Sequence, residues 1–149
     1  MMGAVTTPDP HNLQRFIDAQ HGTFEIALAE LERGTKLSHW MWFVFPQLAG
    51  LGRSATAQHY AIESLEEAKA YLADPVLGPR LERSVETLLA WSGKRSVGQI
   101  FGPVDTMKLR SSLTLFNRAA PGAMFGRALD SFFAGERDER TLALLNEER

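Results

Sequence analysis

The sequence contains no cysteine among its 149 residues. A chain without thiols forms no disulfide, has no thiolate nucleophile and cannot build a zinc site from cysteine ligands. Cysteine-based redox chemistry is therefore excluded. The absence is typical of proteins in the reducing cytoplasm, where we expect this protein to reside.

An excess of charge of one sign is also missing. The chain has 16 Lys and Arg against 18 Asp and Glu, which gives a formal net charge of -2 at pH 7. This balance produces no global field that would attract nucleic acid or an anionic membrane surface. We therefore do not expect nucleic acid as a partner, and any site for an anion must be local.

Long apolar runs are absent as well. The longest, residues 40–46, is far shorter than the about 20 residues that a membrane-spanning helix needs, so we expect a soluble protein without membrane contact. The start of the chain has neither the basic patch nor the apolar stretch of a secretory signal. We expect residues 1–8 to form a flexible tail.

Several motifs of catalysis and metal binding are not found. The chain has no G-x-S-x-G and no P-loop, and the Gly-Leu-Gly at 50–52 lacks the preceding strand of a dinucleotide fingerprint. The histidines never lie four residues apart and have no carboxylate at a metal-ligand interval. They are His11, His21, His39 and His59. We therefore expect no metal site and no cofactor.

What the chain does have is apolar material for one core, with breakers at helical intervals. Hydrophobic residues make up 44% of a chain whose length suits a single domain. Between the glycine and proline breakers, apolar residues recur with a helical rather than an alternating period. We predict an all-α fold over residues 9–149, a single compact orthogonal helical domain of seven to nine helices around a central aromatic segment.

Capping residues indicate where the helices begin and end. Asp-Pro pairs at 9–10 and 74–75 predict helix starts, and Gly34 predicts a left-handed helix end. Ser64 and Glu67 match a capping box. The helices expected from such signals cover residues 10–20, 24–33, 55–60, 65–73, 75–93, 97–101, 105–117 and 121–134, with a last helix after Asp138.

Two breaks are predicted inside this pattern. Gly102 and Pro103 should separate a short turn from a longer helix that Asp105 caps, because proline cannot continue a helix. Gly78 and Pro79 are expected to kink or restart the helix that follows residue 75.

The aromatic segment lies within residues 36–54. Residues 40–46, WMWFVFP, have no period, so we expect them to be buried on all sides, as a helical turn or as an extended piece. Polar side chains are interleaved, namely His39, Gln47, Arg53 and Ser54. Two interpretations stay open: a segment that serves only the core, and one that also lines a pocket for a planar ligand.

The second unusual segment is 105–117. Two of its three helix faces are polar, and serine and threonine are poor residues for a helix interior. In a purely structural interpretation, the hydroxyls bond back to helix carbonyls and both cations reach solvent. In the alternative interpretation, the segment binds an anion such as a phosphate. Lys108 supplies a compact charge, Arg110 binds through the paired N–H groups of its guanidinium, and Ser111 and Ser112 donate hydrogen bonds.

These segments carry a resemblance to a known family. Residues 39–47, 50–54, 71–72 with 75–81, and 108–116 resemble the bacterial domain-of-unknown-function family 1810, over a range from Asp9 to Leu145. The resemblance implies an all-helical single domain and no established activity. Some members carry the name calpastatin, a disordered protease inhibitor, with which this aromatic-rich composition is incompatible. A fainter likeness, without matching residues, is to proteins that act on ADP-ribose or related N-glycosidic nucleotides.

We predict that the two segments converge on one pocket for a small phosphorylated or nucleotide-like ligand. A tryptophan would stack on a ring and the cations would hold a phosphate. The candidate ligand-binding residues are His39, Trp40, Trp42, Gln47, Arg53, Ser54, Lys108, Arg110, Ser111 and Ser112.

The class of function has alternatives. Enzyme and passive binder both stay open, because the groups that could move a proton, His39, Asp105 and Glu25, are not placed by their spacing. A protein-interaction module is the alternative to both, with a purely structural aromatic core and an exposed apolar patch in place of a polar pocket. The sequence sets neither the ligand nor the oligomeric state.

Overall fold

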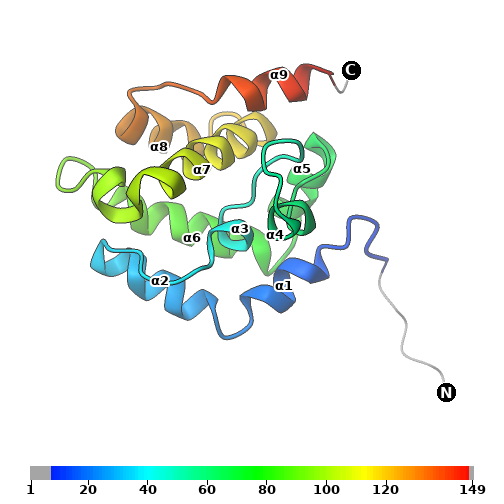
Figure 1. The fold of residues 1–149 in the computed structure, drawn as a ribbon, viewed down its shortest axis with the longest axis horizontal. Helices are drawn as coiled ribbons and strands as arrows, with labels where there is room; N and C mark the ends of the chain where they lie inside the picture. Colours follow the sequence, from blue (N-terminus) through cyan, green and yellow to red (C-terminus); the bar gives the residue numbers. More distant parts are fainter. Residues whose placement is uncertain (1–7, 148–149) are drawn as a thin grey trace.

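The computed structural model describes residues 8–147 and shows nine α-helices and no strand in that range (Figure 1). The all-α prediction and the predicted number of helices are confirmed. Of the tail predicted over residues 1–8, positions 1–7 lie outside the described residues. The helices are α1 (Gln14–Gln20), α2 (Phe24–Arg33), α3 (Met41–Val44), α4 (Ala55–His59), α5 (Leu65–Ala73), α6 (Leu77–Leu89), α7 (Val97–Ala119), α8 (Met124–Phe133) and α9 (Glu139–Glu147).

Most helix ends follow the predicted capping chemistry. The Ser64 hydroxyl accepts a hydrogen bond of 3.1 Å from the Glu67 backbone N–H at the start of α5. The carboxylates of Asp74 and Asp138 accept hydrogen bonds from the first turns of α6 and α9. Gly34 ends α2 with φ 72°, a left-handed conformation that glycine adopts without strain.

The first helix begins later than predicted. The Asp9 carboxylate accepts hydrogen bonds from the backbone N–H groups of Leu13 and Gln14, at 2.8 and 3.0 Å. Asn12 between them has φ 51°, which no α-helix includes. The Asp-Pro pair at 9–10 therefore starts a turn, and α1 begins at Gln14.

Of the two predicted breaks, one is corrected and one is confirmed. Helix α6 runs from Leu77 to Leu89, so Gly78 and Pro79 fall in its first turn, where the missing N–H of proline costs no helical bond. Gly102, with φ 79° and ψ 170°, leaves helical geometry, so α7 consists of a short and a longer helical segment that meet at a kink, as predicted. Asp105 lies inside α7, caps nothing and forms ion pairs instead.

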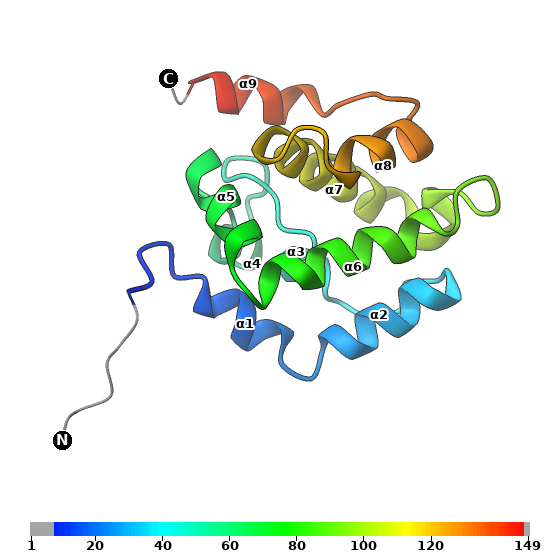
Figure 2. The same cartoon turned by 180° about the vertical axis from the view of Figure 1, so that it is seen from behind.

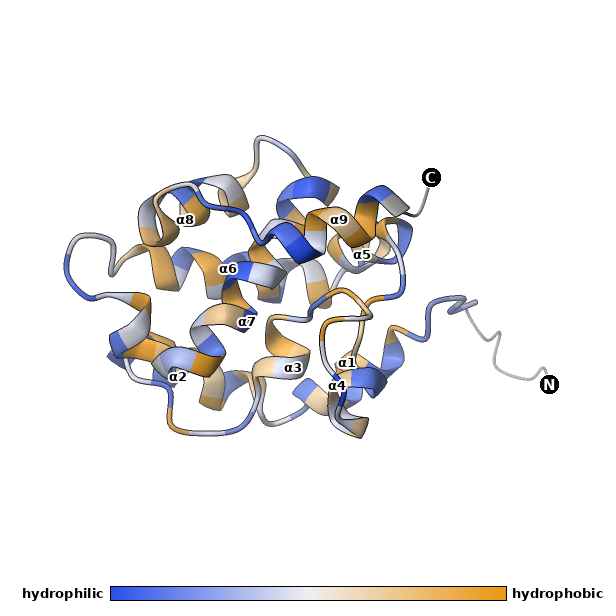
Figure 3. Cartoon of the chain, turned by 45° about the horizontal axis from the view of Figure 1, so that its top comes forward, coloured by the Kyte–Doolittle hydropathy of each residue, from blue (hydrophilic) through white to orange (hydrophobic). Residues whose placement is uncertain are grey.

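Helix α7 is the centre of the fold. It packs against α5, α8 and α9, while α6 packs against α2, α5 and α8, so the helices stack from α1 and α2 up to α9 (Figure 2). Helices α8 and α9 carry both apolar and hydrophilic stretches, as helices with one packed face do (Figure 3). One hydrophobic cluster extends from Phe16 to Leu145.

The polar faces predicted for 105–117 are covered by this packing. Residues 109–116 are buried except for Arg110, so this part of α7 is enclosed on nearly all sides. The Ser111 and Thr114 hydroxyls donate to the carbonyl four residues earlier, as the structural interpretation predicts. Lys108 and Arg110 lie beside carboxylates, with side chains 23% and 30% exposed, so both cations reach solvent in part.

Within residues 8–147, no helix combines the length and the apolar content that crossing a membrane requires.

Candidate functional site

A buried carboxylate positions the aromatic segment. Glu30 of α2 is 3% exposed and accepts hydrogen bonds from the backbone N–H groups of Leu37 and Ser38, at 2.7 and 3.0 Å, and from the Trp40 indole at 2.9 Å. The Ser38 hydroxyl adds a fourth bond at 2.5 Å. Burial by itself would raise the pKa of Glu30, but the four hydrogen bonds outweigh it and lower the pKa to about 2. The charged carboxylate therefore holds the chain just before α3.

The aromatic segment itself is one helical turn, α3. On this turn Trp40 and Phe45 face the core and are 0% exposed, together with buried Met41 and Val44. Trp42 is only partly buried, so the expectation that the whole segment is enclosed is wrong. A single turn spreads consecutive side chains around its axis, and Trp42 therefore faces away from the core.

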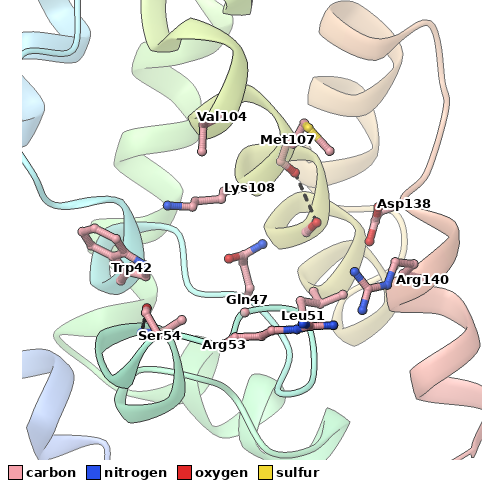
Figure 4. A pocket seen from close by; sticks show the side chains of 13 residues that line it. Trp42, Gln47, Leu51, Arg53, Ser54, Val104, Met107, Lys108, Asp138 and Arg140 are labelled. Carbon is pink, nitrogen blue, oxygen red and sulfur yellow. Dashed lines mark hydrogen bonds between the residues drawn. The ribbon is translucent and has the colours of Figure 1, made fainter.

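Trp42 borders a cavity of about 410 Å³ whose lining comes from α3, the loop at 47–54, α4, α7 and the start of α9. Figure 4 shows side chains from these elements pointing into it. The lining residues are Trp42, Gln47, Leu51, Gly52, Arg53, Ser54, Ala57, Val104, Met107, Lys108, Ser111, Asp138 and Arg140. The two unusual sequence segments thus line the same cavity.

Lys108 joins the two segments directly. Its ammonium nitrogen lies 4.3 Å from the centroid of the Trp42 ring, within the range of a cation–π interaction. Asp105 lies 3.5 Å from Lys108 but only 2.8 Å from Lys36, whose side chain is 7% exposed. Two lysines therefore share one carboxylate, and the cluster keeps a positive charge at the cavity.

The other polar side chains of the lining differ in whether they are free to bond a ligand. The Gln47 side-chain amide has no hydrogen-bond partner within residues 8–147, and Figure 4 places it in the middle of the cavity. The Ser54 hydroxyl accepts the N-cap bond of α4 from Ala57 N–H at 3.0 Å, which leaves its own hydrogen free to donate. Ser111 donates to the Met107 carbonyl at 3.2 Å instead.

Four of the candidate residues lie elsewhere. Trp40 is enclosed in the core and His39 is exposed, and neither lines the cavity. Arg110 lies 3.7 Å from Glu136, and its Nε is buried without a hydrogen-bond partner among the described residues. The Ser112 hydroxyl is buried in the same way. The predicted anion site of Lys108, Arg110 and both serines is thus divided, because these residues point to different sides of α7.

The lining also includes side chains that the sequence did not reveal. Val104 and Met107, 66% and 64% exposed, form an apolar wall, and Asp138 and Arg140 enter from α9. The Thr114 hydroxyl accepts a hydrogen bond from Asp138 N–H at 2.9 Å, which sets the start of α9 beside α7. Asp138 carried a visible capping signal, but no local pattern indicates that a residue two positions later reaches this cavity.

The site offers cations, donors and an aromatic face, without a placed acid or base. His39 and Glu25 are exposed outside the lining, and Asp105 is occupied by two lysines. Asp138 accepts hydrogen bonds from the Thr141 N–H and hydroxyl, at 3.0 and 2.6 Å. In the described part of the chain, no three His, Asp or Glu side chains are grouped as metal ligands. The chemistry favours recognition of an anion that carries a planar group.

Comparisons with known proteins give two matches, one to a solved structure and one to a family model. The chain is 47% identical to the conserved hypothetical protein Rv1873 from Mycobacterium tuberculosis, with a TM-score of 0.89 to its crystal structure. The alignment covers 93% of this chain and 99% of that one. The comparison with curated proteins gives no match. The model of a family described as protein of unknown function (DUF1810) matches residues 10–145, and the chain belongs to this family.

Proposed function

We propose that the cavity binds a small phosphorylated molecule that contains a planar ring, of the nucleotide type. The observation that carries this proposal is the position of the Lys108 ammonium 4.3 Å from the Trp42 ring centre, at the wall of a cavity of about 410 Å³. Cavities of roughly 300–1,000 Å³ with an apolar wall and a few polar groups are typical of small-molecule sites.

The lining offers two kinds of contact, one for the ring of the ligand and one for its phosphate. A planar ring would lie against Trp42 and the apolar wall of Val104 and Met107, in the place that the Lys108 ammonium now takes. Lys108 would then move from the indole to the phosphate, because a charge-assisted bond to a phosphate is stronger than a partly exposed cation–π contact. Gln47 would bond the edge of the ring or a hydroxyl group.

The site supports binding better than catalysis. Its lining contains one carboxylate, Asp138, and this group already holds the first turn of α9. No histidine lines the cavity. General acid–base chemistry needs a titratable group within hydrogen-bond reach of the ligand, and the lining provides none that is free. We propose a binding protein of the cytoplasm, with the location taken from the lack of cysteine.

An interaction module is the second candidate, favoured by exposed apolar side chains beside the cavity. Leu37, Val104 and Met107 are 72%, 66% and 64% exposed. Lys36 and Asp105, the sequence neighbours of Leu37 and Val104, form an ion pair of 2.8 Å that joins the two segments carrying these apolar residues. Val104 and Met107 have a second explanation as the apolar wall of the ligand site.

A thermal-shift screen separates the two candidates. The ligands are nucleosides, nucleoside monophosphates and sugar phosphates, and a ligand at 100 times its Kd stabilises the folded state by about 2.7 kcal/mol. We expect stabilisation by nucleoside monophosphates but not by nucleosides, and its loss in Lys108→Met. The control is Lys69→Met, which removes an exposed lysine from α5. The absence of any shift with all phosphorylated ligands would reject ligand binding and favour the module.

A further inference from the structure

Two arginines meet at the end of the cavity away from Trp42. Arg53 belongs to the loop before α4, and Arg140 lies in the first turn of α9. Figure 4 shows their guanidinium groups pointing toward one another, with Gln47 between them and the Trp42–Lys108 end. The cavity therefore has two cationic ends, of which the proposed function uses only one.

Within the described part of the chain, neither guanidinium has a carboxylate partner. The ion pairs within 4 Å among residues 8–147 include neither Arg53 nor Arg140. The acid nearest in the lining, Asp138, is engaged by the Thr141 N–H and hydroxyl at 3.0 and 2.6 Å. Two like charges that converge without a counter-charge repel each other, and an anion between them removes this cost.

Both arginines project from backbone that is held in place. The Arg53 carbonyl accepts a hydrogen bond of 3.1 Å from the Gln58 side chain. Arg140 follows Asp138, whose N–H is bonded to Thr114 on α7, and its own NH2 group reaches the Gly50 carbonyl at 3.4 Å. One weak bond leaves most of the five guanidinium donors free. The backbone that carries both arginines is thus fixed before any ligand arrives.

We infer that Arg53 and Arg140 form a second anion subsite, and that the ligand carries two phosphate groups in series, as a nucleoside diphosphate does. This inference rests on the proposed function, since it concerns the same cavity. Lys108 holds the phosphate next to the ring, as a compact point charge on a flexible stem. The two guanidiniums bind the terminal phosphate through paired N–H donors, a geometry that suits its oxygens.

Calorimetric titration with the mono- and diphosphates of the four common ribonucleosides tests the inference. The wild-type chain is compared with Arg53→Met, Arg140→Met and the double variant. Arg127→Met is the matched control, because Arg127 is exposed on α8 and lines no part of the cavity. Circular dichroism verifies that each variant is folded, which we expect because both arginines are exposed.

We expect at least one diphosphate to bind about tenfold or more tightly than its monophosphate, the effect of one charge-assisted hydrogen bond or more. Each arginine variant should remove most of this advantage and leave the affinity for the monophosphate within about threefold. Arg127→Met should change neither affinity. Equal affinities in the wild type, or an advantage that survives in the double variant, would overturn the second subsite and leave the proposed function intact. If no mono- or diphosphate binds, both proposals are wrong.

Discussion

The Thr114 hydroxyl on α7 accepts a hydrogen bond of 2.9 Å from the Asp138 backbone N–H, and donates its own hydrogen to the Arg110 carbonyl at 2.8 Å. Two residues earlier on the same helix, the Ser112 hydroxyl is buried with no partner in the described part of the chain. Both residues are buried, but the two hydroxyls differ in what they bind. Of the two, only Thr114 bonds to the residue that precedes α9, the helix that carries Arg140 to the cavity.

Thr114→Val should lower the free energy of unfolding by about 1–2 kcal/mol, because valine keeps the shape and leaves the Asp138 N–H without its acceptor. Ser112→Ala is the matched control and should change stability by no more than about 0.5 kcal/mol, since no bond is lost. Urea denaturation measures both. Similar losses in the two variants would mean that the Thr114 bond does not stabilise the protein.

Local signals predict the helices better than they predict the site. Asp74 and Asp138 act as caps from sequence positions that need no knowledge of the fold. Gly102 and Pro103 were predicted to separate two helical segments, and the backbone does leave helical geometry at Gly102. A glycine followed by proline is a break that the local sequence is enough to predict.

The site residues, too, were predicted correctly only in part. Trp42 and Lys108 were predicted to meet because both lie in segments with more polar and aromatic groups than a core requires, and they lie 4.3 Å apart. Arg110 and Ser112 were grouped with them by sequence proximity, although a helix turns about 100° per residue and sends them to other sides. Arg140 belongs to α9, and its place at the cavity follows only from how α9 packs on α7.

The contact between Lys108 and Trp42 should be measurable as a coupling energy. A double-mutant cycle of Lys108→Met and Trp42→Leu is expected to give about 0.5–1 kcal/mol of favourable interaction, the range of a partly exposed cation–π pair. Urea denaturation of the four proteins provides the value. The same cycle with Lys69→Met should be additive, because Lys69 lies exposed on α5. Zero coupling in the first cycle would show that the two groups do not interact in solution.

The buried Glu30 carboxylate should give the protein an acid-dependent part of its stability. Its folded pKa of about 2 lies below the ordinary 4.5, so the unfolded chain binds the proton more readily between these values. The contribution, about 3 kcal/mol at most, is complete above the unfolded pKa and is lost as the pH falls from about 4.5 toward 2.

Glu30→Gln removes this contribution. The amide nitrogen of glutamine would face N–H donors, so we expect a loss of up to about 3 kcal/mol at pH 7 and a much smaller difference from the wild type near pH 3. Glu32→Gln, an exposed change on the same helix, should have little effect at either pH. Urea denaturation at both pH values is the measurement. A difference that stays constant between pH 7 and pH 3 would contradict a lowered pKa.

The last prediction concerns the close approach of the loop at 47–54 to α4. A Cβ atom added at Gly52 would lie 2.6 Å from the Ala57 Cβ, too close for two carbons in contact, so the loop that carries Arg53 would have to move. Gly52→Ala should therefore cost about 1–3 kcal/mol of stability. It should also weaken ligand binding at the cavity. Adding Ala57→Gly restores the space and should recover part of the loss, less the about 0.5–1 kcal/mol that glycine costs within a helix.

Gly98→Ala is the control for the glycine substitution itself. The nearest atom to a Cβ at Gly98 is the Ser96 hydroxyl oxygen at 3.8 Å, an ordinary contact, and α7 is helical at this point. This change should raise stability by about 0.4–1 kcal/mol, because alanine restricts the unfolded chain more than glycine does. Thermal or urea unfolding of the three variants and the wild type measures the set. If the Ala57→Gly change restored nothing, the contact between Gly52 and Ala57 would not be what limits the loop, and the position of Arg53 would have to depend on other contacts.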